Sequence, residues 1–307
     1  MPNFRTETMA DQSGRRVVVT GANSGLGLRI AEALAAKGAE VTLACRSADR
    51  GAAAVERIRE SHPGASVRLV MLDLASLASI SAFAAAWEGP LDLLVNNAGI
   101  MATARATTRD GFEQQLGINH LGHFALAGLL LPALRLAPAA RVVVLSSIAH
   151  KRGTIDFGDL MSASRYRRWS AYSQSKIANL YYAMEFARRL EGTGENIVVA
   201  AAHPGLARTN LPASMGRDPM AALTGVFMRF AAQSDIAGAL PALYAATAPD
   251  VHGGDFFGPN GPGERHGDVT QVAPAARVAD LAVARRLWTV SEELTGVSYP
   301  GLPPLPD

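Results

Sequence analysis

The chain has 307 residues, of which 49% are hydrophobic, so it can bury a large core, and its composition excludes disordered, collagen-like and disulfide-stabilised proteins. Its 29 basic and 27 acidic residues leave a net charge of +2, which argues against a nucleic-acid-binding surface and favours small molecules as partners. The single cysteine, Cys45, excludes an intramolecular disulfide and is compatible with a reducing cytoplasm.

The first 16 residues are polar and lack the apolar core of a signal peptide. The most apolar window, residues 124–134, is too short to span a bilayer and contains Pro132. We therefore expect a soluble, cytoplasmic protein without a membrane span.

Short β-branched runs alternate with alanine-rich helical stretches through the first hundred residues. The pattern predicts strands over residues 15–20, 40–46, 66–74 and 91–99, and helices over residues 24–38, 48–62 and 77–89. The strands are apolar without alternation, as expected where helices cover both faces of a parallel sheet. The sequence therefore predicts an α/β fold of the Rossmann type.

The same alternation continues to about residue 259. It predicts a long helix near 111–136, a strand at 141–147, a helix near 170–190, a strand at 196–205, a helix near 234–246 and a last strand at 254–259. We expect one domain with a doubly wound parallel sheet of about seven strands and helices on both faces. Gly122, Gly128 and Pro132 are unusual inside the long helix, and the pattern does not explain them.

The turn from the first strand into the first helix is rich in glycine. Gly21, Gly25 and Gly27 stand in "VVVTGANSGLGLRI", where glycine lets the backbone adopt positive φ and lets a pyrophosphate approach the helix N-terminus. A structural turn without a ligand is the alternative. Because the trio opens the first βαβ unit, the position favours a dinucleotide site.

The second strand ends in "ACRS", where an NAD-binding protein would carry an acidic residue about 20 residues past the glycines. Arg46 stands there instead, and its guanidinium suits a 2′-phosphate. A solvated arginine at a strand end is the alternative. The sequence favours NADP(H) over NAD(H).

Tyr172 and Lys176 are four residues apart in "AYSQSKIANL", a spacing that places two side chains on one helix face. An ammonium group beside a phenol favours the phenolate, so we expect Lys176 to lower the pKa of Tyr172. The phenol could then exchange a proton with a substrate near neutral pH. A packed aromatic residue beside a surface lysine is the alternative.

With these motifs in order, the chain resembles the short-chain dehydrogenase/reductase family from about Gly14 to Pro259. The resemblance rests on "TGANSGLG", "DL" at residues 73–74, "NNAG" at 96–99, "IN" at 118–119, "SS" at 146–147, "YSQSK" at 172–176 and "PGLART" at 204–209. Within the family, the chain looks most similar to the retinol dehydrogenase and protochlorophyllide reductase-like branch.

The resemblance implies a role for each matching residue. Tyr172 would be the acid or base and Lys176 would also bind the nicotinamide ribose, while Ser147, preferred over Ser146, would polarise the carbonyl. Asn119 would shape the long helix and connect Lys176 to a water chain, and Thr209 would bind the nicotinamide carboxamide. The implied cofactor-binding residues are Gly21, Asn23, Ser24, Gly25, Leu26, Gly27, Arg46, Asp73, Leu74, Asn97, Ala98, Gly99, Tyr172, Lys176, Pro204, Gly205 and Thr209.

The resemblance implies an NAD(P)-binding catalytic domain (14–259) with a substrate loop (206–233). Outside this range we expect an N-terminal extension (1–13) and a C-terminal tail (260–307) that packs on the domain as an extended surface strap with one helix in it. The implied reaction is hydride transfer between NADP(H) and a carbonyl or alcohol on a hydrophobic substrate. The alternatives are an enzyme that reduces a conjugated carbon–carbon bond and a non-catalytic nucleotide sensor. Because many relatives form homodimers or homotetramers, the resemblance also implies one of these assemblies.

Two groups of polar residues stand near the motifs. The segment between Ser147 and Tyr172 is longer than is typical of the family, and its basic residues either meet an anionic substrate or form a solvated face. His120, His123, His150 and His203 lack carboxylate or cysteine partners at metal spacing, so we expect no metal. We expect His120 and His123 to face a neighbour or solvent.

Overall fold

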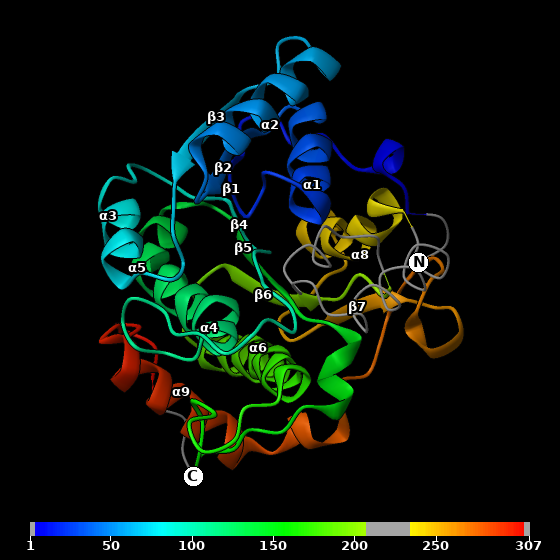
Figure 1. Ribbon diagram of the computed structural model, residues 1–307. Coiled ribbons are helices and arrows are strands. Elements are labelled where there is room, and N and C mark those ends of the chain that lie inside the picture. Colours follow the sequence, from blue (N-terminus) through cyan, green and yellow to red (C-terminus); the bar gives the residue numbers. More distant parts are fainter. Residues whose placement is uncertain (1–3, 207–233, 304–307) are drawn as a thin grey trace.

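The computed structural model describes residues 4–206 and 234–303, and its centre is an eight-stranded sheet with strand order β3-β2-β1-β4-β5-β6-β7-β8 (Figure 1). Neighbouring strands are parallel, except that β8 pairs antiparallel with β7. The strands are β1 (Arg16–Thr20), β2 (Glu40–Cys45), β3 (Val67–Met71), β4 (Leu93–Asn96), β5 (Ala140–Leu145), β6 (Ile197–Ala202), β7 (Phe256–Pro259) and β8 (Val269–Gln271). The predicted fold class is confirmed, with one strand more than expected.

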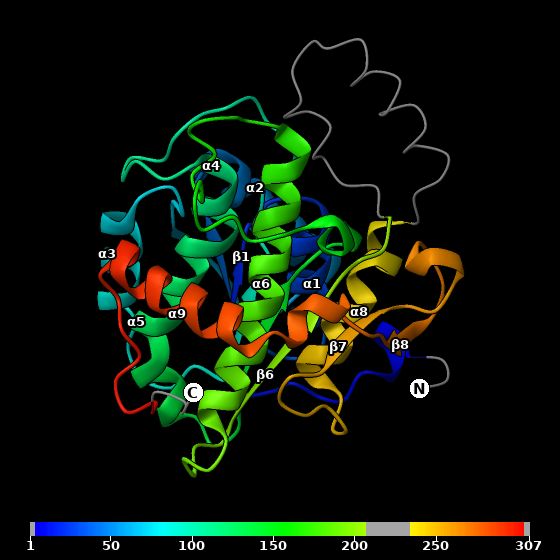
Figure 2. The ribbon, with the colours of Figure 1, turned by 90° about the horizontal axis from the view of Figure 1, so that it is seen from below.

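Helices cover both faces of the sheet (Figures 1 and 2). Val17 and Val19 of β1 pack on one face of the sheet, here called the first face, and Val18 between them packs on the opposite, second face. For this reason β1 is apolar throughout. The first face is covered by α1 (Gly25–Ala36), α2 (Ala48–Ser61) and α8 (Asp235–Thr247), and the second by α3 (Leu77–Ala85), α5 (Gly122–Leu136) and α6 (Arg168–Leu190).

The long helix predicted from residue 111 begins later and is not regular. It starts with α4 (Gln114–Leu116), where the Glu113 carboxylate accepts the amide hydrogens of Gln115 and Leu116 at 2.9 and 2.7 Å. A π-helical turn, Gly117–Leu121, then leads into α5. A Cβ on Gly122 would lie 2.7 Å from the Leu74 carbonyl oxygen, so a close approach of backbone explains this glycine.

The C-terminal tail contains the expected helix and, in addition, the strand β8. After β8, it forms α9 (Leu281–Thr295), which crosses the outer side of α6 and α5 (Figure 2). The Tyr299 hydroxyl donates to the Phe124 carbonyl at 2.7 Å and lies 2.9 Å from the Tyr182 hydroxyl. A Cβ on Gly128 would lie 2.8 Å from the Tyr299 ring, so Gly128 leaves room for the tail to pack against α5.

One helical stretch in the described ranges is long and apolar enough to be considered as a membrane span. It runs from Gln114 to Leu136, and 83% of its most apolar window is buried inside the protein. Burial of this extent is typical of a core helix.

Candidate active site

The glycine-rich turn after β1 forms the floor of a pocket. Gly21 and Gly25 have φ values of 66° and 56°, which residues with a Cβ rarely adopt. At Gly27 the reason for glycine is space, because an added Cβ would lie 2.7 Å from the Gly21 carbonyl oxygen and even closer to the Asn97 side chain. The side-chain Nδ2 of Asn97 donates to the Thr20 carbonyl at 2.7 Å, and this bond holds the end of β4 against the turn.

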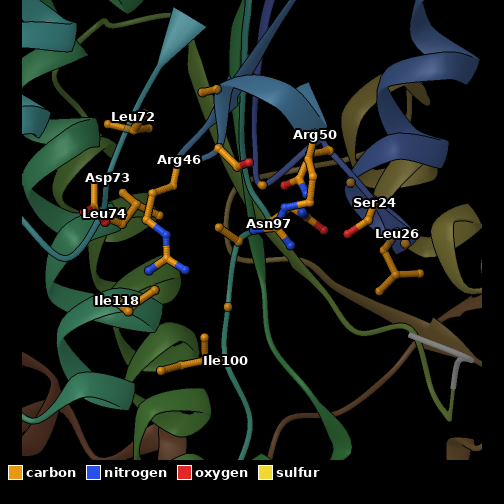
Figure 3. Close-up of a pocket in the computed structure, with 18 residues that line it drawn as sticks. Ser24, Leu26, Arg46, Arg50, Leu72, Asp73, Leu74, Asn97, Ile100 and Ile118 are labelled. Atoms are coloured by element: carbon orange, nitrogen blue, oxygen red, sulfur yellow. The ribbon is translucent and has the colours of Figure 1, made fainter. Parts of the chain in front are cut away.

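The pocket has a volume of about 320 Å³ and lies across the carboxyl ends of β1, β2 and β4 (Figure 3). Arg46 reaches into it from the end of β2, and Arg50 reaches in from the first turn of α2. The predicted cofactor residues that line it are Gly21, Asn23, Ser24, Gly25, Leu26, Gly27, Arg46, Asp73, Leu74, Asn97, Ala98 and Gly99.

Sequence reasoning missed some of the lining, including Ile100, Ile118 and Arg50. Arg50 follows Arg46 by four residues, and this spacing beside a phosphate-binding prediction could have identified it. Pro204 and Gly205 follow β6, at the same edge of the sheet. Thr209 and all but Leu206 of the predicted substrate loop lie outside the described residues.

Tyr172 and Lys176 lie on α6 with the predicted serine beside them. Tyr172 and Lys176 are buried, and the Ser147 side chain is near enough to the Tyr172 phenol to favour its ionised form. The Ser146 hydroxyl instead donates to the Lys176 carbonyl at 2.8 Å, so of the two serines it is Ser147 that meets the phenol. Lys176 Nζ donates to the Leu145 carbonyl at 3.1 Å and lies 6.0 Å from the centre of the Tyr172 ring.

Burial dominates the acidity of this pair. It lowers the pKa of Lys176 to about 8. It raises the pKa of Tyr172 above its ordinary value, against the opposing effect of the Ser147 hydrogen bond. The pKa of Tyr172 is therefore raised and not lowered as expected, because burial removes the phenolate from water.

Asn119 lies in the π-helical turn and connects three elements. Its Oδ1 accepts the Ile100 amide hydrogen at 2.8 Å, and its Nδ2 donates to the Ile100 carbonyl and to Ser175 Oγ, both at 2.9 Å. A Cβ on Gly99 would lie 3.2 Å from Asn119 Oδ1 and 3.4 Å from Lys176 Nζ. The segment after β4, the π turn and α6 therefore meet at Lys176.

His120 and His123 are buried, so of the two expected surroundings they face neighbouring side chains and not solvent. His123 Nε2 lies 2.9 Å from Thr20 Oγ1, and its Nδ1 lies 3.0 Å from the Asn119 carbonyl oxygen. His120 Nε2 lies 3.0 Å from Ser291 Oγ of α9. The two imidazoles thus link the turn at β1 and the tail to the helix that holds Asn119.

We expect His120 to make the protein sensitive to acid. Burial lowers the pKa of His120 to about 4, whereas an unfolded histidine binds a proton near pH 6.5. Between these values the unfolded state binds more protons, so stability falls as the pH falls. For His120 alone, the free energy of unfolding should drop by about 2 kcal/mol from pH 7 to pH 5.

Urea unfolding at both pH values checks this expectation. A His120→Asn variant should lose this part of the pH dependence. A His252→Asn variant should keep it, because the His252 side chain is 83% exposed. Equal pH dependence in His120→Asn and the unmodified protein would contradict it.

The described surroundings of the Tyr172 ring are apolar. Met101 and Ala102 pack against Tyr172 together with Ala149, and the half-exposed Trp169 ring stands edge-on to the phenol at 6.1 Å. Within residues 4–206 and 234–303, no three histidine, cysteine or carboxylate side chains are close enough together to hold a metal ion.

Comparisons with known proteins find relatives of this chain. A family model described as "short chain dehydrogenase" matches residues 15–219. Human retinol dehydrogenase 13 is 42% identical over 306 residues, covering 95% of this chain and 88% of the relative.

Two solved structures extend the comparison. A crystal structure of an uncharacterised protein from Mycobacterium paratuberculosis superposes with a TM-score of 0.82 at 41% identity, covering 97% of this chain and 99% of that one. The Pseudomonas aeruginosa RhlG/NADP active-site complex superposes with a TM-score of 0.63 at 26% identity, covering 80% of this chain and 94% of that one.

Proposed function

Because the chain belongs to the short-chain dehydrogenase family and is an NAD(P)-dependent oxidoreductase acting on CH–OH or C=O groups, we propose that it prefers NADP(H) and acts on a hydrophobic alcohol or carbonyl compound, with Tyr172 as its acid or base. The observation that carries this proposal is the position of the Tyr172 phenol near Ser147 and Lys176, among apolar side chains.

The pocket suits a dinucleotide that carries an additional phosphate. An added Cβ on Gly25, the first residue of α1, would have no neighbouring atom within 4 Å, so the start of α1 has room for a pyrophosphate in the pocket. Arg46 and Arg50 bring two guanidinium groups to the end of β2, where an NAD-binding site would hold a carboxylate. The NADP bound by the P. aeruginosa relative is consistent with this preference.

The chain's own residues would handle the proton. When bound, the nicotinamide supplies or accepts the hydride. The Ser147 and Tyr172 hydroxyls would hold the substrate oxygen, and the phenol would donate a proton to it during reduction and remove one during oxidation. Lys176, with a pKa of about 8, can carry the positive charge that stabilises the phenolate left after donation.

The substrate's reacting group would be attached to an apolar body. Met101, Ala149 and Trp169 supply apolar surface around the phenol. Retinol, for which the human relative is named, is an alcohol on such a body.

The test is turnover by the purified chain. NADPH absorbance is followed with aldehydes, ketones and conjugated enones of increasing chain length, and with the matching alcohols and NADP⁺ in the reverse direction. Faster reaction of long apolar aldehydes or ketones is the expected result. Reduction of only the carbon–carbon bond of the enones, or equal rates with NADH, would contradict the proposal.

Removal of the Arg46 guanidinium should weaken binding of NADPH but not of NADH. An Arg46→Ala variant should bind NADPH about ten-fold more weakly, because one charge-assisted phosphate contact is lost, and should bind NADH within two-fold of the unmodified protein. Fluorescence titration with both cofactors measures this. An Arg57→Ala variant, on the same helix α2 but outside the pocket lining, is the control. Equal losses for the two cofactors would contradict a 2′-phosphate contact at Arg46.

A further inference from the structure

The loop between β7 and β8, residues 260–268, contacts two segments of the active site through one carboxylate. Lys151 Nζ donates to Glu264 Oε1 at 2.6 Å, and His203 Nε2 lies 3.1 Å from Glu264 Oε2. Lys151 stands in the short 3-10 helix Ile148–Arg152, which begins directly after Ser147. His203 directly precedes Pro204 and Gly205.

The hydrogen bond that His203 Nδ1 accepts determines which ring nitrogen carries the proton. The Gly205 amide donates to His203 Nδ1 at 3.2 Å, so Nδ1 is the acceptor and the proton is on Nε2, which faces the Glu264 carboxylate. The imidazole is fully buried. Contact with His203 and Lys151 lowers the pKa of Glu264 to about 2, so the carboxylate stays ionised at neutral pH.

The same loop also supports the backbone after His203. The Leu206 amide donates to the Arg265 carbonyl at 2.8 Å, and a Cβ on Gly205 would lie 2.5 Å from that carbonyl oxygen. Glu264 itself has a φ of 56°, which is unfavourable for a residue with a Cβ. Such a conformation persists where surrounding contacts hold it, as the two contacts of the carboxylate do here.

The Ser147 turn is braced from the tail in a similar way. His150 Nδ1 lies 2.7 Å from the Ser147 carbonyl oxygen, and its Nε2 accepts the Ala275 amide hydrogen at 3.3 Å. Phe256 of β7 packs against the rings of both His150 and His203. The chain from β7 to Ala275 therefore lies against the two segments that follow β5 and β6.

We propose that Glu264 is a positioning residue that fixes the loop 203–206 relative to the Ser147 turn and so shapes the nicotinamide half of the cofactor site. This inference rests on the proposed function, with Arg46 at the adenosine half of the cofactor. It places Pro204 and Gly205, which resemblance to the family implies as cofactor-binding residues, at the nicotinamide half because they shortly precede Thr209, the residue expected to bind the nicotinamide carboxamide. Glu264 acts through Lys151 and His203 without touching the cofactor.

Two ligands separate the halves of the site. NADPH occupies both halves, and 2′,5′-ADP, the probe for the adenosine half, lacks the nicotinamide. A Glu264→Gln variant keeps the shape of the side chain but loses its charge, so it should bind NADPH about ten-fold more weakly and 2′,5′-ADP within two-fold of the unmodified protein. General damage to the fold would weaken the binding of both ligands equally.

The control is Asp268→Asn, which makes the same chemical change in the same loop. Asp268 pairs with Arg5 at 2.8 Å on the surface, where both side chains are about half exposed, and the variant should bind both ligands normally. If Glu264→Gln does not fold, a Lys151→Met variant provides a second test. It removes one of the two contacts of Glu264, and the Lys151 side chain is 42% exposed. This variant should bind NADPH about three-fold more weakly and 2′,5′-ADP normally.

Amide hydrogen exchange of the ligand-free protein gives a readout that does not depend on cofactor binding. Glu264→Gln should speed exchange at Gly205 and Leu206 about ten-fold and leave β8 unchanged, whereas Asp268→Asn should change neither. Unchanged exchange at these two amides, or equal losses for the two ligands, would overturn the inference. The expected exchange effects in a protein that binds neither ligand would support the brace and contradict the proposed function instead.

Discussion

Replacement of Tyr172 by phenylalanine should reduce kcat about a thousand-fold while the protein still folds and binds NADPH. The change removes the hydroxyl that meets Ser147 and leaves the buried ring in place. A positioned proton donor or acceptor contributes roughly 10²- to 10⁴-fold to a rate, and no other phenol lies in the apolar cluster with Met101 and Ala102 among the residues that the structure describes. Steady-state kinetics with saturating NADPH and the best aldehyde of the panel measure the loss.

The control lies on the same helix. The Tyr181 hydroxyl donates to the Arg277 carbonyl at 2.7 Å, away from the pocket, so Tyr181→Phe makes the same chemical change and should keep kcat within two-fold. Near-normal turnover by a well-folded Tyr172→Phe protein would end the case for Tyr172 as the acid or base.

Replacement of Trp288 by alanine should lower the free energy of unfolding by about 3–5 kcal/mol, because the removal of a large buried aromatic leaves a cavity. Trp288 is 2% exposed. Its ring lies 4.6 Å from the Tyr299 ring and 5.1 Å from the Phe124 ring, and the Arg189 guanidinium lies 4.4 Å from its centre. Urea unfolding at pH 7 measures the effect.

A Leu281→Ala variant tests whether the loss of stability in Trp288→Ala comes from the burial of the side chain or from any substitution in α9. Leu281 is in α9 like Trp288 but is 43% exposed, so its loss should change stability by no more than about 0.5 kcal/mol. If the two variants were equally stable, α9 would be a surface appendage and not part of the core.

Features that depend on neighbours in sequence could be predicted from the chain alone. The period of apolar residues identified the alternating strands and helices. The glycine turn and the four-residue spacing of Tyr172 and Lys176 identified the two parts of the site. The family and its retinol dehydrogenase branch, inferred from these motifs, are confirmed by the relatives.

Features that depend on residues far apart in sequence could not be predicted from the chain alone. The Tyr299 hydroxyl bonds to a carbonyl 175 residues away, so no local pattern shows that the tail completes the core. His123 looks like an exposed polar residue until Thr20, 103 positions earlier, is brought beside it. The raised pKa of Tyr172 follows from burial, which the spacing to Lys176 does not reveal.

The position of α9 also has a consequence for how the protein is made. During synthesis from the N-terminus, α5 and α6 leave the ribosome well before the aromatic rings that cover them. Until Trp288 and Tyr299 emerge, the Phe124, Tyr182 and Phe186 side chains lack this cover. A nascent chain that stalls or ends before residue 288 would therefore expose an aromatic surface that chaperones and proteases can bind. The surface is covered only after the last segment has been synthesised.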